Sequence, residues 1–93
     1  MFRHIVLFRI HDDIAQARVD EAIARLRSLG DLPGIVRWRV ERSRDTRKGR
    51  VVVEDAAFTD AAAFYAFAAH PAHVAAGEML SEISDWWIGD YDD

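Results

Sequence analysis

The first strand-like segment of the chain, Phe2 to Ile10, is apolar on both faces, and this restricts the fold more than any other feature. Aromatic and β-branched residues dominate it, which is typical of a β-strand. Side chains alternate along a strand. One face therefore carries Phe2, His4, Val6, Phe8 and Ile10, and the other carries Ile5 and Leu7. A strand that is apolar on both faces is covered on both faces. We therefore expect its sheet to pack on helices on one side and on another layer on the other.

The next segment predicts an amphipathic helix with Asp12 or Asp13 as its N-terminal cap. Its apolar residues recur at steps of three and four positions, at Ile14, Ala17, Val19, Ala22, Ile23, Leu26 and Leu29. Gly30 is the expected C-terminal stop of this helix, and Pro33-Gly34 is the expected turn into the following strand.

Two strands joined by a polar loop are expected in the middle of the chain. In the first strand, one face is apolar and the other charged: Val36, Trp38 and Val40 alternate with Arg37, Arg39 and Glu41. The loop runs from Ser43 to Gly49, which is an ordinary length for a hairpin connection. The next strand covers Val51 to Phe58.

A second helix, capped by Thr59 or Asp60, is expected to break near His70, because the residue before a proline is pushed out of the helical region. The helical pattern resumes at His73 and continues to Ile83. A last strand then contains Trp86, Trp87, Ile88 and Tyr91, and Asp92-Asp93 is expected to be a short exposed end.

The resulting order, β-α-β-β-α-β, predicts an α+β, ferredoxin-like fold: a four-stranded antiparallel sheet with two helices on one face. With 93 residues, the chain has the length of one domain, 1–93. The other face of such a sheet is uncovered in a monomer, and here it would carry apolar residues. A homodimer with two sheets face to face is the simplest way to cover it.

Composition narrows the functional classes. The chain has no cysteine, so disulfides and thiolate metal sites are not expected, and no other metal site is indicated. A net charge of −4 argues against nucleic acid as a partner. No apolar run approaches the ~20 residues of a membrane span, and the N-terminus resembles a strand more than a signal peptide. We therefore expect a cytoplasmic protein.

The strongest indication of a catalytic or binding site is His70-Pro71-Ala72-His73, where two histidines flank a proline in an apolar, alanine-rich segment. Histidine exchanges protons near neutral pH. His73 is thus a candidate general acid/base, with the alternative of a helix-capping histidine near the break. His4 either shares a proton with His73 or is a satisfied core histidine. His70 is expected to be mainly structural, with ligand contact as its alternative.

Other residues could complete a ligand site. Glu54 and Asp55 are adjacent in a strand and point to opposite faces, and the sequence does not say which faces the helices. If Glu54 does, it could hold a histidine in one tautomer; if Asp55 faces a dimer interface, a partner's arginine could meet it. Five aromatic residues in the C-terminal half of the chain could either line an apolar ligand pocket or belong to the core. They are Phe64, Tyr65, Phe67, Trp86 and Trp87.

Five segments together resemble the stress-responsive A/B barrel (Dabb) family over nearly the whole chain. They are the opening Phe-Arg-His-Ile-Val-Leu-Phe, Leu32-Pro33-Gly34, Phe58-Thr59-Asp60, His70-Pro71-Ala72-His73-Val74 and Gly89-Asp90-Tyr91. The resemblance implies a dimeric α+β barrel. The chain is similar to polyketide cyclases of the olivetolic acid cyclase type, and this similarity implies cofactor-free chemistry. It implies that His73 is the acid/base, and that His4 and His70 match two further histidines of those cyclases. Phe67 stands where those cyclases carry a tyrosine.

The expected function is that of a small dimeric barrel protein, a cofactor-independent acid/base enzyme acting on a small hydrophobic carbonyl substrate, as in polyketide cyclisation. The alternative is a non-catalytic stress-responsive or ligand-binding dimer that uses the same cavity. A third hypothesis is that the chain is a cofactor-free monooxygenase of similar barrel shape.

Overall fold

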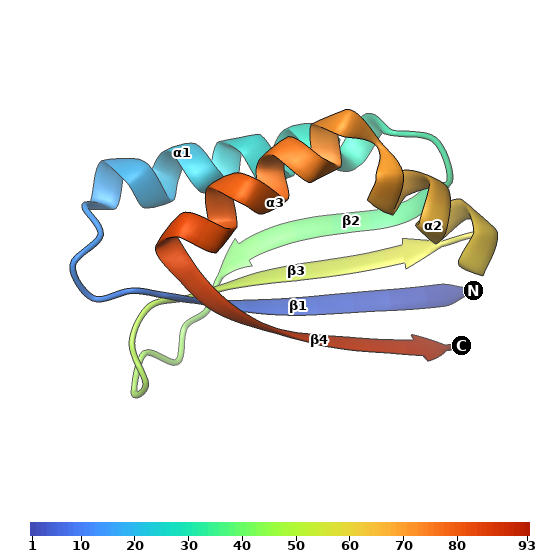
Figure 1. Cartoon of the computed structure of the whole chain (residues 1–93). Coiled ribbons are helices and arrows are strands. Elements are labelled where there is room, and N and C mark those ends of the chain that lie inside the picture. The colour runs from blue at the N-terminus through green and yellow to red at the C-terminus, as the bar shows by residue number, and fades with distance from the viewer.

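The computed structural model describes residues 1–93 and contains one antiparallel sheet with all helices on the same face (Figure 1). Its elements are β1 (Phe2–Ile10), α1 (Gln16–Arg27), the 3-10 helix η1 (Ser28–Asp31), β2 (Ile35–Arg42), β3 (Val51–Phe58), α2 (Ala61–Ala69), α3 (Pro71–Ile83) and β4 (Ser84–Asp92). The strand order is β2-β3-β1-β4. The predicted α+β, ferredoxin-like class is confirmed.

The break between α2 and α3 lies where the sequence predicts it. Asp60 caps α2, and its side chain accepts a hydrogen bond from the backbone N–H of Ala63. Pro71 occupies the first turn of α3, where its missing N–H costs nothing. His70 between the helices has extended backbone angles, φ −65° and ψ 134°, as expected for a residue before proline.

The predicted boundaries of α1 are wrong at both ends. The helix begins at Gln16 after Ala15, which makes no side-chain cap. Asp12 instead lies in a turn, where it pairs with Arg9 at 3.1 Å. At the other end, Gly30 does not stop the helix but lies inside η1. A Cβ at Gly30 would lie 2.9 Å from Cδ1 of Trp38, so the glycine makes room for that indole.

A β-bulge changes the predicted face of Val36. The pairing of β2 with β3 shifts register between Ile35 and Arg37, because a bulge adds one residue to one strand. Val36 is consequently 53% exposed, whereas Ile35 packs against the core. Val40, beyond the bulge, is buried as its alternation predicts.

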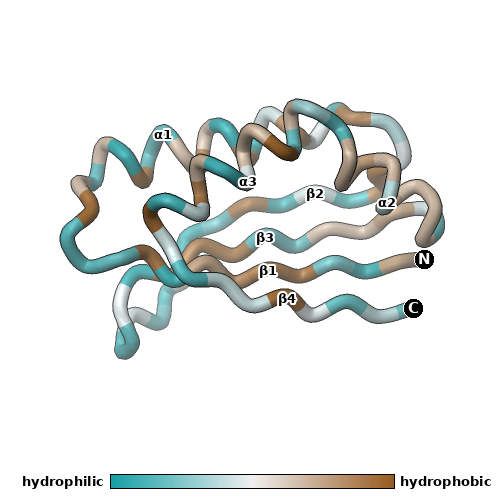
Figure 2. The backbone as a smooth tube through the Cα atoms, viewed as in Figure 1, coloured by the Kyte–Doolittle hydropathy of each residue, from teal (hydrophilic) through white to brown (hydrophobic).

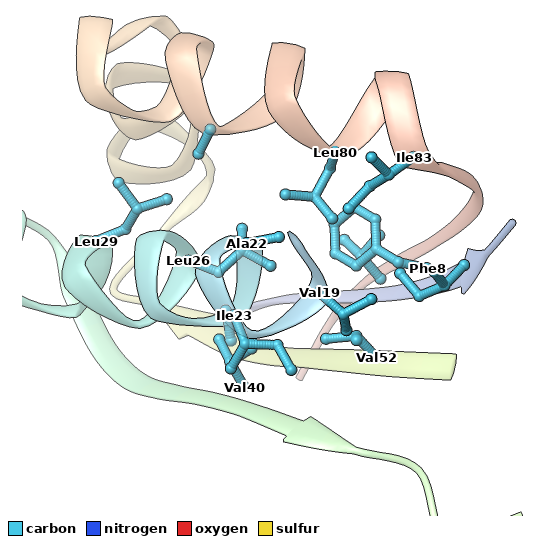
Figure 3. Close-up of a cluster of buried hydrophobic side chains, with 14 of the residues drawn as sticks. Phe8, Val19, Ala22, Ile23, Leu26, Leu29, Val40, Val52, Leu80 and Ile83 are labelled. Atoms are coloured by element: carbon cyan, nitrogen blue, oxygen red, sulfur yellow. The ribbon is translucent and has the colours of Figure 1, made fainter. Parts of the chain in front are cut away.

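The hydrophobic core fills the space between the helices and the sheet. Figure 3 shows Phe8 and Val52 of the sheet beneath Leu80 and Ile83 of α3, with Val19 of α1 beside them. The tube in Figure 2 alternates between hydrophobic and hydrophilic along α1, while the middle of β1 is hydrophobic without interruption. The core therefore covers one face of β1 and leaves the other apolar face open.

That open face carries both apolar and charged side chains. Leu7 of β1 lies opposite Trp87 of β4, and the two are 43% and 62% exposed. Nearby, Asp55 of β3 accepts a hydrogen bond from Arg3 at 2.9 Å and pairs with Arg37 at 3.4 Å. Asp55 is thus paired within its own chain. None of the helices combines the length and hydrophobicity needed to cross a membrane.

Candidate functional site

A pocket of about 480 Å³ lies between the helices and the half of the sheet formed by β1 and β4. His4, Glu54 and His73 line it together with mainly apolar side chains, including Val6, Phe8, Phe64, Leu80, Trp86 and Ile88. Its size is that of a small-molecule site. The pocket exists because β4 is an edge strand that α2 and α3 cover incompletely: Trp86 and Ile88 remain 46% and 55% exposed.

Sheet register places His4 between two carboxylates. His4 of β1 lies opposite Asp90 of β4 and Ala56 of β3. Glu54, two residues from Ala56, faces the same side of the sheet because side chains repeat with a period of two. The His4 ring therefore has Asp90 Oδ1 at 2.5 Å from Nδ1 and Glu54 Oε2 at 3.3 Å from Nε2. Glu54, and not Asp55, faces the helices.

This placement favours the charged form of His4. The ring is buried beneath Phe64, whose centroid lies 4.6 Å away. Burial by itself lowers the pKa of His4, but pairing with Glu54 and with Asp90 outweighs it, so the pKa lies above the ordinary value. Both carboxylates stabilise the charged ring, with Asp90 beside Nδ1 and Glu54 beside Nε2.

Folding stability should consequently decrease as pH rises above 6.5, the ordinary pKa of histidine. Between that pH and the raised pKa of folded His4, the native state binds more protons than the unfolded state, so the free energy of unfolding falls with pH. The stabilisation is complete below this window and lost above it, with a slope of at most ~1.4 kcal/mol per pH unit.

Urea denaturation at pH 6, 7 and 8 measures this effect. The His4→Gln variant cannot titrate at this position and should lack the part of the slope that His4 causes. Equal slopes in the two proteins would show that the protonation of His4 is not coupled to folding.

His73 is held by a backbone carbonyl instead of a carboxylate. It lies in the first turn of α3, and its Nδ1 is 2.9 Å from the carbonyl oxygen of Ala68 in the last turn of α2. A carbonyl can only accept, so Nδ1 carries a proton, and in this tautomer of the neutral ring the lone pair is on Nε2. The Phe67 ring packs on the imidazole with centroids 4.6 Å apart. His73 therefore caps a helix, one of the two alternatives considered from the sequence, and it also lines the pocket.

Three other predicted ligand contacts lie outside the pocket lining. His70 caps α3, and its Nδ1 accepts a hydrogen bond from the N–H of Ala72 at 3.0 Å. Phe67 is 2% exposed and packs against Phe58 and Trp38. Tyr65 is 65% exposed. Phe64, Trp86 and Glu54 do line the pocket.

Asp90 is the site residue that sequence reasoning missed. Asp90 belongs to the family-like segment Gly89-Asp90-Tyr91, and alternation along β4 places it on the same face as Trp86 and Ile88. An acidic residue in that apolar series was the available signal. Its partner could not be named, because pairing with His4 depends on the register of β1 and β4.

The arrangement places two imidazoles with different hydrogen-bond partners on one apolar pocket. The two carboxylates approach His4 from different ring nitrogens and do not converge, and no group of three or more His, Cys, Asp or Glu side chains is arranged to hold a metal ion. The side chains present are suited to moving protons on an apolar molecule.

Comparison with solved structures finds the same fold in several proteins. A dimeric ferredoxin-like protein of unknown function from Thermobifida fusca YX matches with a TM-score of 0.88 and 22% identity, over 99% of this chain and 90% of that one. A dimeric ferredoxin-like protein of unknown function from Jannaschia sp. CCS1 matches with a TM-score of 0.81 and 29% identity, over 99% and 98%.

SnoaB, a cofactor-independent oxygenase from Streptomyces nogalater, matches with a TM-score of 0.81 and 27% identity, over 99% of this chain and 91% of that one. No curated protein matches the sequence. The sequence itself matches the stress responsive A/B barrel domain over residues 2–93. With this fold and this match over nearly its whole length, the chain belongs to the stress responsive A/B barrel domain family.

Proposed function

We propose that the chain is a cofactor-independent acid/base enzyme acting on a small hydrophobic carbonyl compound, with polyketide cyclisation as the reaction class. One observation carries the proposal: His4, which is paired with carboxylates, and His73, whose Nδ1 donates to a backbone carbonyl, line a single apolar pocket of about 480 Å³. General acid/base catalysis requires such a pair, one group able to accept a proton and one able to give it.

The roles follow from the ring nitrogens. His73 Nε2 removes a proton from the carbon beside the substrate carbonyl, since its Nδ1–H is occupied by Ala68. His4 Nε2–H stabilises the negative charge that then develops on the carbonyl oxygen. This N–H lies 3.3 Å from Glu54 without the alignment of a hydrogen bond.

Turnover is the test of this proposal. A panel of linear polyketide thioesters and acids is incubated with the wild-type protein, and cyclisation is compared with the spontaneous rate. Cyclisation above background supports the enzyme. Binding of an apolar ligand by calorimetry, without turnover of any panel member, would refute it and leave a ligand-binding protein.

Cofactor-free oxygenation is a second candidate, favoured by the similarity to SnoaB. The same base, His73, would generate the carbanion that reacts with oxygen. Repeating the panel with and without oxygen separates the two reactions, because cyclisation does not consume oxygen and oxygenation does.

We also propose that the working form is a homodimer joined through the open face of the sheet. Leu7 and Trp87 leave apolar surface there, and the similar proteins from Thermobifida fusca and Jannaschia are described as dimeric. Sedimentation at micromolar concentration should give twice 10.6 kDa. A species of 10.6 kDa alone would contradict the dimer.

A further inference from the structure

The buried carboxylate of Glu54 is incompletely satisfied. Glu54 is 2% exposed, yet its Oε2 has no hydrogen-bond partner within the chain. Most buried polar atoms in folded proteins have such a partner, and leaving one without it is destabilising. This oxygen has the His4 ring beside it but no aligned donor, and this requires an explanation.

The surrounding protein offers no donor to complete this oxygen. His4 Nε2 is 3.3 Å away but is not aligned as a hydrogen bond, and the other ring nitrogen is bound to Asp90. Val6, which lies opposite Glu54 in the sheet, and Phe64, which packs on His4, have no N–H or O–H on their side chains. No donor of the chain is aligned with Oε2 in this structure, so a donor on a molecule inside the pocket would complete it.

We propose that Glu54 is a specificity-determining residue that accepts a hydrogen bond from a ligand hydroxyl, so that the preferred ligands are apolar molecules bearing an enol or phenol group. This rests on the proposed use of the pocket as the substrate site. A hydroxyl has one hydrogen to donate, which matches one unpartnered acceptor. An ammonium group has three, and its burial here would leave donors unpaired.

Three naphthalene probes test the wild-type protein. 1-Naphthol donates a hydrogen bond, 1-methoxynaphthalene only accepts one, and 1-methylnaphthalene does neither, at nearly the same size. Calorimetry should show 1-naphthol binding about tenfold or more tightly than the other two, the usual effect of a hydrogen bond to a charged group. Equal affinities, or no binding of any probe, would overturn the proposal. Equal affinities would mean that water completes Glu54.

The Glu54→Gln variant gives a sharper test. The amide keeps one acceptor oxygen, for which His4 Nε2–H competes, and replaces the other with an NH₂ donor. The preference should then disappear or reverse in favour of 1-methoxynaphthalene. Glu82→Gln on α3 removes a carboxylate of the same kind outside the pocket and should retain the wild-type preference. An unchanged preference in Glu54→Gln would refute the role of Glu54.

These outcomes are independent of turnover. A hydroxyl preference without cyclisation would refute the enzyme and leave the ligand class intact. Cyclisation without a hydroxyl preference would support the enzyme and refute the role given to Glu54.

Discussion

Replacing His73 with alanine should lower kcat/KM by roughly 10²–10⁴, the usual contribution of a positioned acid/base group. The loss is expected because His73 lines the pocket and its bond to the Ala68 carbonyl makes Nε2 the proton-accepting nitrogen of the neutral ring. Initial rates on the best substrate of the panel, measured for the wild type and the variant at equal folded concentration, give this number.

His70→Ala is the matched control for this variant. It also removes a histidine at the junction of α2 and α3, but one that caps α3 and does not line the pocket. It should cost about 1 kcal/mol of stability, the usual value of an N-cap, and leave kcat/KM close to the wild type. If both variants lose rate equally, the junction as a whole matters and His73 has no distinct chemical role.

The second large effect concerns stability. His4→Ala should lower the free energy of unfolding by about 3 kcal/mol or more, because it leaves the Glu54 carboxylate buried without its cation. The side chains of His4 and Glu54 are only 6% and 3% exposed. Chemical denaturation of the two proteins measures the difference. His11→Ala is the control: His11 pairs with the exposed Asp85 at 3.3 Å, and its loss should cost little.

The double variant His4→Leu, Glu54→Leu separates pairing from packing. Replacing both members of a buried pair by apolar residues is often neutral or stabilising, so this protein should be more stable than His4→Ala. Equal instability of the two variants would show that the imidazole itself fills space that leucine cannot, and that the unpaired carboxylate is not the cause.

Much of the fold could be predicted because it depends on local pattern. The two-sided apolar character of β1, the strand Val51–Phe58 and the break at Pro71 each follow from residues that lie next to one another in the sequence. The predictions from the sequence are wrong where tertiary contacts determine where a helix begins or ends. Asp12 pairs with Arg9 in a turn instead of capping α1, and Gly30 accommodates Trp38 instead of ending the helix.

The site was harder to predict because it depends on register. The sequence identified His4 and His73 by residue type, and Glu54 as one of two candidates for the inner face. It could not show that β3 and β4 bring Glu54 and Asp90 to the two nitrogens of His4. It also gave no sign that the Ala68 carbonyl fixes the tautomer of His73, since that contact joins the end of one helix to the start of the next.

Nitrogen-15 NMR of the histidine rings at pH 7 tests the central claim most directly, because ring-nitrogen shifts report both charge and tautomer. The assignments come from His4→Gln and His73→Ala. The account predicts that both nitrogens of His4 are protonated, whereas His73 is neutral with its proton on Nδ1. A neutral His4, or a His73 that is protonated on Nε2, would contradict it.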